Sequence, residues 1–492
     1  ARMINLQQLL PNSQCALVDI QHLTLDSRQV QPGSLFLAFP GARSDGRDHI
    51  KQALEAGAIA VAYESADGCH GADLQDFASK AAMVPIAGLA AQVSAIAGRF
   101  YQEPSHSLGL IGITGTNGKT SVSQMLAQAL SSMGKPCGVI GTLGSGLLPA
   151  LTDHGMTTPD AVSVQQQLAD MCDQGAGWVC MEVSSHALDQ GRVAALEFDL
   201  AVFTNLSRDH LDYHGDMAHY AGAKAKLFDR PLQAAIINLD DAFGLELIER
   251  SPSRCMTYSL SNAEADLYCS AIEYTSAGIC ATLHTSRRKA VLATPLLGEF
   301  NLANLLAVVC TLLALEVRLD RAVELAAGLA PPAGRMQRLG GREQPLVVID
   351  YAHTPDALEK ALAAVRAHVS GNLTCVFGCG GDRDSGKRPL MGQIAERNAD
   401  HVLVTDDNPR SENSQHIIEH ILAGMQHPEA AKVAASRAEA IRNSIVHAQV
   451  GDVILLAGKG HETYQEIDGV RHPFSDIEQA TRALQEWEAA HA

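Results

Sequence analysis

The chain has 492 residues, of which 46% are hydrophobic and 19% charged, and this composition is typical of a globular protein of about three domains. Its formal net charge of −18 disfavours nucleic acid and other polyanions as partners. The eleven cysteines form no CxxC pair, no apolar run is long enough to span a bilayer, and the first residues lack a secretion-signal core, so we expect a cytoplasmic protein without a membrane segment.

The N-terminal part, residues 1–89, contains strand patterns and one clear helix pattern. The helix is expected at Asp48–Ala56 and the strands at Cys15–Ile20, Ser34–Phe39 and Ala58–Tyr63. Between these elements lie turn signals with polar tips, which favour binding loops and ordinary turns about equally. A helix at Ala90–Tyr101 then leads into the next part of the chain.

The strongest signal in the chain is a phosphate-loop pattern. Leu108–Thr114 is apolar and β-branched, Gly115–Gly118 can turn with its backbone exposed, and a helical pattern follows Lys119. In such a layout the loop N–H groups and the helix N-terminus face an anion, the lysine adds a charge, and Thr120 reaches a metal ion. The spacing departs from the strict P-loop because Ile113 occupies the first glycine position. We predict an ATP triphosphate site with Mg²⁺, in preference to a plain strand-to-helix turn.

The pattern after the loop alternates strands and helices, which predicts a largely parallel sheet with helices on its faces. The expected elements are strands at 137–141, 178–183, 200–206 and 235–239 and helices near 160–174 and 217–229. Between Cys255 and Thr294 short β runs indicate a meander, and helices follow near 301–314 and 320–328. Pro331–Gly334 is the best linker signal.

The last part of the chain alternates again and predicts a second doubly wound sheet. Four polar clusters directly follow its expected strands, and they lie at 350–353, 378–384, 406–410 and 458–462. The carboxyl ends of strands form the binding crevice of such sheets, so four clusters at four strand ends favour a binding site over turn chemistry alone.

Oxygen ligands for magnesium are expected near the phosphate loop. Glu182 lies near the end of an apolar strand and is suited to hold the metal beside Thr120, although it could instead cap the next helix. His210 and His214 are spaced i, i+4, but nothing nearby completes a zinc site, so a single imidazole on magnesium or a polar surface loop is favoured. Nothing in the spacing singles out either lysine of Ala223–Leu227, and two solvated lysines are the expectation from the pattern alone.

With these motifs in view, the chain resembles the Mur ligases of peptidoglycan synthesis over nearly its whole length. The family's ATP motif, Thr-Gly-Thr-Asn-Gly-Lys-Thr-[Ser/Thr], is matched at Thr114–Ser121, and the Asp-His-Leu-Asp-Tyr-His stretch at Asp209–His214 follows in the family's order. The resemblance implies an α/β protein of three domains. These are a small UDP-sugar-binding domain at 1–89, a central ATPase with a mostly parallel sheet plus a β meander at 90–332, and a C-terminal Rossmann-like amino-acid-binding domain at 333–492. We also expect a monomer.

The resemblance further implies roles for individual residues. The expected UDP-substrate contacts are Leu25, Ser27, Ala42, Arg43, Ser44, Thr157, Thr158, Ser184, Gln190 and Arg192. The family often has Asn before the Thr pair, where this chain has Met156. The expected nucleotide contacts are Gly115, Thr116, Asn117, Gly118, Lys119, Thr120, Ser121, Asn301, Arg335 and Asp350. The expected amino-acid contacts are Arg383, Asp407, Asn408, Pro409, Arg410, Gly458 and Glu462.

The resemblance also assigns the catalytic and metal groups. Lys119, Glu182, His210 and Lys224 are the expected catalytic residues, and Thr120 joins the last three as a magnesium ligand. Lys224 matches a lysine that is carbamylated in the family, which turns a cation into a metal-binding carboxylate.

The implied reaction joins meso-2,6-diaminopimelate to a UDP-N-acetylmuramoyl-dipeptide through an acyl phosphate formed with ATP. Two rivals remain. Folylpolyglutamate synthetase shares the ATPase core, but its loop typically has Gly where this chain has Thr120, and it has no counterpart of the Asp-Asn-Pro-Arg cluster at 407–410. A nucleotide switch would hydrolyse nucleotide without an amino-acid acceptor, and the chain contains no Asn-Lys-x-Asp guanine signature.

Overall fold

The computed structural model describes residues 3–41, 44–66, 80–207 and 209–491. The chain divides into two compact units, Ala1–Thr257 and Tyr258–Ala492. Parallel sheets covered by helices occur in both units, which confirms the α/β class. Among the described helices none has the length and apolar character needed to cross a membrane.

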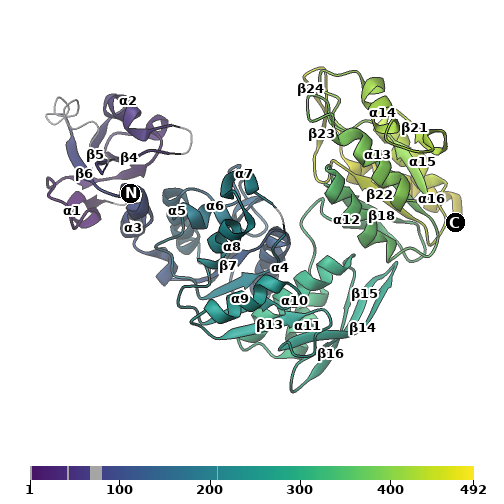
Figure 1. Ribbon diagram of the computed structural model, residues 1–492, viewed down its shortest axis with the longest axis horizontal. Helices are drawn as coiled ribbons and strands as arrows, with labels where there is room; N and C mark the ends of the chain where they lie inside the picture. Colours follow the sequence, from purple (N-terminus) through teal and green to yellow (C-terminus); the bar gives the residue numbers. More distant parts are fainter. Residues whose placement is uncertain (1–2, 42–43, 67–79, 208, 492) are drawn as a thin grey trace. The chain divides into compact units, whose positions relative to one another are not determined.

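The N-terminal part of the first unit is a small parallel sheet of order β3-β4-β5-β6. Its strands are β3 (His22–Thr24), β4 (Ser34–Ala38), β5 (Ala58–Glu64) and β6 (Ala82–Ile86). One face packs on α2 (Ile50–Glu55) and the other on α1 (Leu6–Leu9) and α3 (Leu89–Tyr101) (Figure 1). The strand expected at Cys15–Ile20 was wrong except at its end, because only β2 (Asp19–Ile20) pairs, and its partner β1 (Ile4–Asn5) is equally short. Short 3-10 turns lie at Ser27–Gln29, Gly46–His49 and Pro104–His106.

The rest of the first unit is built on strands in the order β13-β12-β11-β7-β10-β8-β9. The strands are β7 (Gly109–Thr114), β8 (Cys137–Gly141), β9 (Gly144–Leu147), β10 (Trp178–Glu182), β11 (Leu200–Phe203), β12 (Ala234–Asn238) and β13 (Cys255–Ser259), the last of which crosses the unit boundary. The helices are α4 (Lys119–Ser131), α5 (Ala161–Asp173), α6 (Ser185–Asp189), α7 (Leu211–His214), α8 (Met217–Ala225) and α9 (Ala242–Arg250). The neighbouring strands from β12 to β8 pair parallel, and β9 pairs antiparallel with β8.

The register of this sheet brings three strand ends together. Glu182 at the end of β10 lies beside Ile113, and Phe203 at the end of β11 lies beside Thr114. Because the three strands are parallel, the residues that follow them all emerge at one edge of the sheet. This edge carries the phosphate loop.

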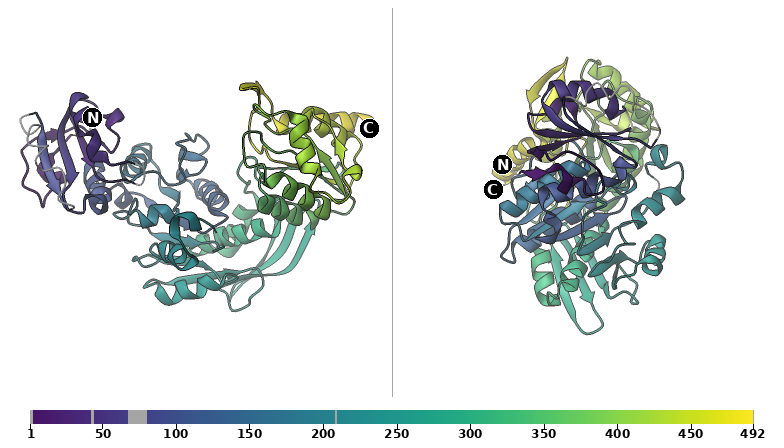
Figure 2. Two further views of the ribbon diagram at one scale, coloured as in Figure 1. Left: turned by 45° about the horizontal axis from the view of Figure 1, so that its top comes forward. Right: turned by 90° about the vertical axis from the view of Figure 1, so that its left-hand side faces the viewer.

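The second unit begins with the β meander expected from the sequence. Its strands are β14 (Leu267–Thr275), β15 (Gly278–His284) and β16 (Lys289–Thr294), paired antiparallel. Figure 2 shows them as long extended ribbons in the teal part of the chain. Two helices follow, α10 (Glu299–Ala314) and α11 (Leu319–Ala327).

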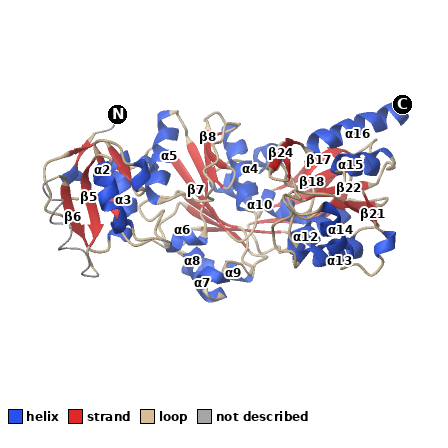
Figure 3. Cartoon of the chain, turned by 90° about the horizontal axis from the view of Figure 1, so that it is seen from above, coloured by secondary structure: helices blue, strands red, loops and turns tan. Residues whose placement is uncertain are grey.

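The C-terminal part is a sheet of order β17-β18-β22-β19-β20-β21, parallel except for β17. Its strands are β17 (Gln337–Gly340), β18 (Leu346–Asp350), β19 (Leu373–Phe377), β20 (His401–Val404), β21 (Lys432–Val433) and β22 (Val453–Ala457). The helices α12 (Pro355–Arg366), α13 (Lys387–Asn398) and α14 (Ser414–Leu422) cover one face. The other face packs on α15 (Arg437–Val446) and α16 (Asp476–His491) (Figure 3). A 3-10 turn lies at Pro428–Ala430, and a hairpin, β23 (Tyr464–Ile467) and β24 (Val470–Pro473), precedes α16.

Two expected elements end earlier in the structure than the apolar pattern predicts. β11 stops at Phe203 rather than at residue 206, because Thr204 and Asn205 turn their side chains to the phosphate loop. Helix α8 ends at Ala225 rather than at residue 229. The sequence patterns also missed β3, β6, β9, α9 and the β23–β24 hairpin, which are short or lack a clear period.

Candidate functional site

The phosphate loop is held in shape by the end of β11. The Asn117 amide donates to Oδ1 of Asn205 over 2.9 Å, and Oγ1 of Thr204 donates to the Asn117 carbonyl over 2.6 Å. Gly115 has a φ of +151°. A Cβ there would lie 1.9 Å from Thr204 Oγ1, so only glycine fits this close approach. The loop is therefore preformed, and the N-terminus of α4, which begins at Lys119, can face an anion.

Lys119 lies inside this loop. Its Nζ donates to the carbonyls of Gly115 and Thr116 over 2.8 and 3.0 Å. Burial lowers the pKa of the Lys119 ammonium, and the nearby carboxylates of Glu182 and Asp209 oppose that shift. Thr120 and Ser121 form the first turn of α4.

Glu182, at the end of β10, is the buried carboxylate of the site. Its Oε2 accepts from Thr120 Oγ1 over 2.9 Å, and its Oε1 accepts from the Thr142 amide over 2.9 Å. Burial raises the pKa of the Glu182 carboxyl, while the Thr142 amide and the Lys119 charge lower it. The structure thus brings Thr120 and Glu182 together. The sequence analysis missed Thr142, although it follows the expected strand 137–141 and obeys the same strand-end rule.

Lys224 is buried against the loop, with 1% of its surface exposed. Its Nζ donates to the Gly115 carbonyl over 3.0 Å and lies 4.5 Å from the centre of the Tyr220 ring. Burial, with a smaller contribution from the charge of Lys119, lowers the pKa of the Lys224 ammonium well below its ordinary value. Lys226 instead has a side chain 47% exposed and pairs with Asp189 over 3.0 Å. The expectation of two solvated lysines is wrong for Lys224.

His210 lies near this group on a polar surface segment. Its ring centre is 6.1 Å from that of Tyr220 and 5.1 Å from that of His186, and its φ is +51°. His214 donates to or accepts from Ser185 Oγ through Nε2 over 3.0 Å. Within the described ranges, no three His, Cys, Asp or Glu side chains are placed to hold a metal ion. The hydroxyl of Thr120 and the carboxylate of Glu182 nevertheless present oxygen atoms of the type that magnesium prefers.

Five of the expected UDP-substrate residues cluster beside Glu182. Thr158 Oγ1 donates to the Glu182 carbonyl over 2.7 Å and accepts from the Ser184 amide over 3.1 Å. Nη1 of Arg192 donates to the Thr158 carbonyl over 2.7 Å, and Arg192 Nε also donates to Gln190 over 3.0 Å. The Thr157 hydroxyl lies 3.0 Å from the Thr142 hydroxyl, and Thr157 thereby belongs to the same cluster. Met156 is exposed next to this cluster.

The remaining expected UDP-substrate residues lie in the N-terminal sheet region. Ser27 is buried and its Oγ donates to Gln52 over 2.9 Å, while Leu25 precedes the same turn. Ser44 accepts from the Gly41 amide over 2.9 Å, and Ala42 and Arg43 lie outside the described residues. None of these residues shares a described hydrogen bond with the cluster at Glu182.

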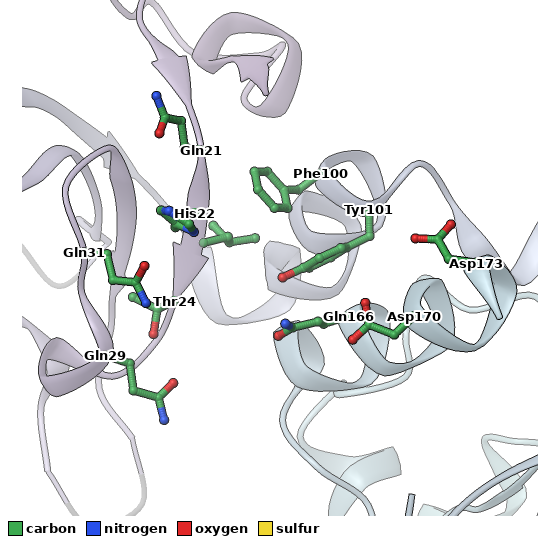
Figure 4. Close-up of a pocket in the computed structure, with 11 residues that line it drawn as sticks. Gln21, His22, Thr24, Gln29, Gln31, Phe100, Tyr101, Gln166, Asp170 and Asp173 are labelled. Carbon is green, nitrogen blue, oxygen red and sulfur yellow. The ribbon is translucent and has the colours of Figure 1, made fainter. Parts of the chain in front are cut away.

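A groove in the same unit separates β3 from α5. Its walls carry amide side chains near β3 and the carboxylates of Asp170 and Asp173 from α5, with Tyr101 between them (Figure 4). None of the expected UDP-substrate residues that the structure describes lines it. Two carboxylates facing the groove oppose binding of a diphosphate there.

Three residues of the second unit are expected to bind the nucleotide, and two of them, Arg335 and Asp350, lie near each other. The Asp350 carboxylate accepts from the amides of Met336 and Ala352 over 2.8 and 2.9 Å, and burial raises its pKa while the charge of Arg335 lowers it. Arg335 lies 5.3 Å from the Tyr351 ring centre. Asn301 is buried, and its Oδ1 has no hydrogen-bond partner among the described residues. A buried oxygen without a partner is uncommon, and it calls for a donor that the described residues do not supply.

The residues expected to bind the amino-acid substrate form two hydrogen-bonded groups at the strand ends of the C-terminal sheet. Arg410 Nη1 donates to the Gly381 carbonyl over 2.7 Å, and Asp382 joins Ser411 over 2.7 Å, so the loops that carry Arg383 and Arg410 are linked. Arg383 itself is exposed and Pro409 is buried.

The second group lies around Asn408. Its Nδ2 donates to Glu462 Oε2 over 3.0 Å. Gly458 has a φ of +116°, and a Cβ there would lie 2.4 Å from Asp407 Oδ2. Burial raises the pKa of the Asp407 carboxyl, whereas the charges of Arg437 and Lys459 lower it. The sequence analysis included Lys459 in the cluster at 458–462 without giving it a role, and it missed Arg437, since neither spacing nor period marks a buried cation.

Comparison with known proteins identifies relatives over the whole chain. The description "Mur ligase family, catalytic domain" matches residues 19–101, "Mur ligase middle domain" residues 113–312, and "Mur ligase, glutamate ligase domain" residues 334–460. The UDP-N-acetylmuramoyl-L-alanyl-D-glutamate–2,6-diaminopimelate ligase of Ectopseudomonas mendocina (strain ymp) is 59% identical and covers 99% of each chain. The protein of the same name from Pseudomonas aeruginosa is 58% identical over 99% of this chain and 100% of its own.

Solved structures give the same relationship. A structure of a ligase with that name is 37% identical, covers 100% of both chains and superposes with a TM-score of 0.79. A folylpolyglutamate synthase from Mycobacterium tuberculosis is 20% identical over 75% of this chain and 92% of its own, with a TM-score of 0.57, and shares the fold.

Proposed function

The chain belongs to the Mur ligase family, and we propose that it joins meso-2,6-diaminopimelate to the D-glutamate of UDP-N-acetylmuramoyl-L-alanyl-D-glutamate, in peptidoglycan synthesis. The observation that carries this proposal is the identity of 58% and 59%, over 99% of the chain, to two proteins with that name. ATP drives the formation of the amide bond.

The reaction has two steps. The terminal carboxylate of the D-glutamate attacks the γ-phosphorus of ATP, forming an acyl phosphate and releasing ADP. The diaminopimelate amine then attacks the acyl carbon, loses a proton, and phosphate leaves from the tetrahedral intermediate. Lys119 and the N–H groups of the first turn of α4 neutralise the charge that develops on the phosphoryl oxygens.

Thr120, Glu182, His210 and Lys224 would hold magnesium, which would supply further charge neutralisation on the phosphoryl oxygens. Lys224 fits this role as a carbamate and not as an ammonium, because a cation beside the metal would repel it. Its neutral amine attacks the carbon of CO₂, a proton leaves, and the product carries one negative charge. The lowered pKa of the Lys224 ammonium favours the neutral amine that this step requires.

The clusters support a placement for the substrates. Thr157, Thr158, Ser184, Gln190 and Arg192 adjoin Glu182, and this supports a pose in which the dipeptide end of the UDP-substrate reaches the phosphate loop. Its uridine end is assigned to Leu25, Ser27 and residues 42–44. Asn301, Arg335 and Asp350 are assigned to ATP as well. We assign the domains to 1–89, 90–332 and 333–492, and propose that closure of the last one excludes water.

The incoming amino acid is assigned to the residues at the strand ends of the C-terminal sheet, namely Arg383, Asp407, Asn408, Pro409, Arg410, Gly458 and Glu462. Carboxylates at Asp407 and Glu462 suit an ammonium group, and the guanidinium of Arg410 suits a carboxylate. Diaminopimelate carries both kinds of group at each end. We further propose that the enzyme is a monomer in the cytoplasm.

The decisive assay is phosphate release from ATP with the UDP-N-acetylmuramoyl-dipeptide, with and without meso-diaminopimelate. Release that depends on all three substrates, with a tripeptide product by mass spectrometry, is expected. Release without any amino-acid acceptor would favour a nucleotide switch, and release only with a folate and glutamate would favour the folylpolyglutamate reaction.

A further inference from the structure

Lys459 is a buried cation at the end of β22 that the reaction described above does not use. Its side chain is 0% exposed. Nζ donates to Asn408 Oδ1 over 3.0 Å and to Glu462 Oε2 over 2.9 Å, and it lies 5.6 Å from the centre of the Tyr464 ring. One ammonium therefore joins the loop after β20 to the loop after β22.

This contact fixes the orientation of the Asn408 amide. Asn408 Oδ1 accepts from Lys459 Nζ and also from the Glu466 amide over 3.0 Å. An oxygen facing two donors cannot be exchanged for the NH₂ group, so Nδ2 must point the other way, toward Glu462. Among the described residues, Glu462 is the recorded acceptor for Nδ2, and we infer that the second N–H of this buried amide is directed at the substrate.

The same contact selects the oxygen of Glu462 that is left for a ligand. Both Lys459 Nζ and Asn408 Nδ2 donate to Oε2, whereas neither donates to Oε1. The Glu462 side chain is 19% exposed, so its carboxylate reaches solvent from this network. The positive charge of Lys459 also offsets the mutual repulsion of Glu462 and the buried Asp407.

We propose that Lys459 is a positioning residue for the amino-acid substrate, which holds Asn408 as a donor and Glu462 as an acceptor side by side. Such a pair fits the carboxylate and ammonium groups of one zwitterionic end of the substrate. This inference rests on the proposed function, because it concerns the amino-acid site of that reaction. Lys459 itself need not touch the substrate.

The test compares Lys459→Met with wild type and with Lys432→Met, a control at an exposed lysine in the same sheet. KM for diaminopimelate is expected to rise by about 30-fold or more, as for truncation of one partner of a buried hydrogen-bonded charge pair. KM for ATP and for the UDP-substrate should stay within about 3-fold. A proportional fall in kcat with unchanged KM for diaminopimelate would overturn the inference.

A second variant separates positioning from folding. In Lys459→Ala, n-butylammonium should restore a low KM for diaminopimelate, whereas n-butanol of the same size should not. Equal rescue by both would show that the lysine only fills space. In the background of Glu462→Gln, Lys459→Met should raise KM by less than it does alone, and full additivity would contradict action through Glu462.

The two proposals fail differently. If wild type releases phosphate in response to diaminopimelate but Lys459→Met keeps a normal KM, the role of Lys459 is wrong and the ligase function stands. If wild type shows no response to diaminopimelate, both are overturned.

Discussion

Nζ of Lys224 lies 3.0 Å from the carbonyl oxygen of Gly115, inside the phosphate loop. The chain thus places a second lysine beside Lys119, although two ammonium groups repel each other there. Burial and, to a smaller extent, the charge of Lys119 lower the pKa of Lys224. Conversion of Lys224 to an anion would turn this repulsion into attraction. The first prediction tests that conversion.

Lys224→Ala is expected to lose nearly all ligase activity, because the carbamate oxygens for magnesium are gone. A short carboxylate such as acetate should restore part of it by entering the space left by the side chain. Lys226→Ala is the matched control, since its exposed ion pair with Asp189 contributes at most about 1 kcal/mol. Steady-state phosphate release compares wild type with both variants, with and without acetate. Full activity of Lys224→Ala, or a loss of equal size in Lys226→Ala, would contradict the assignment.

Lys119→Met should lower kcat/KM for ATP by about 10²-fold or more, because the loop loses its full positive charge. The fold should survive, and circular dichroism checks this. Lys135→Met, at an exposed lysine beyond α4, serves as the control. Folded Lys119→Met with near-normal ligation would exclude the phosphate-loop assignment.

Arg410→Ala and Arg410→Lys should each lower kcat/KM for meso-diaminopimelate by about 10²-fold or more, since an ammonium cannot reproduce bidentate binding of a carboxylate. Wild type should prefer diaminopimelate to L-lysine by on the order of 10⁴-fold. Binding of ATP and of the UDP-substrate should change little. Arg482→Ala on the exposed side of α16 is the control. The specificity assignment is wrong if wild type accepts lysine equally well, or if Arg410→Ala keeps the wild-type preference.

The Glu412 carboxylate gives a prediction for stability and pH. Arg388 donates to its oxygens over 2.8 and 3.0 Å, and this pairing lowers the pKa of Glu412 from 4.5 to about 2. A lowered pKa means that the ionised form stabilises the fold above pH 4.5, and that this contribution is lost as the pH falls toward 2. Urea unfolding should therefore show a steeper loss of unfolding free energy in this window for wild type than for Glu412→Gln. Exposed Glu488→Gln should follow wild type, and identical acid slopes in all three proteins would refute the prediction.

Much of the fold could be predicted from local pattern. The strands Cys137–Gly141 and Leu346–Asp350 begin and end where their apolar runs do, because a buried strand needs little beyond a continuous apolar stretch between turn residues. The phosphate loop could also be predicted from the sequence, because its lysine, glycines and first helical turn are neighbours in the sequence. Short pieces such as β6 and β9 were missed because their pairing partners, and not their own residues, make them strands.

The sequence by itself therefore determined the α/β order, the phosphate loop and the polar clusters at the strand ends. Only the tertiary structure decided which side chains in those segments are buried. Lys224 and Lys226 lie two positions apart, and such residues point to different faces of a helix. Both lysines follow an alanine in the sequence, and no spacing distinguishes them, whereas packing places Lys224 on the Gly115 carbonyl and leaves Lys226 at the surface. The same holds for Lys459, which becomes a buried link only because the loop carrying Asn408, far away in the sequence, folds beside it.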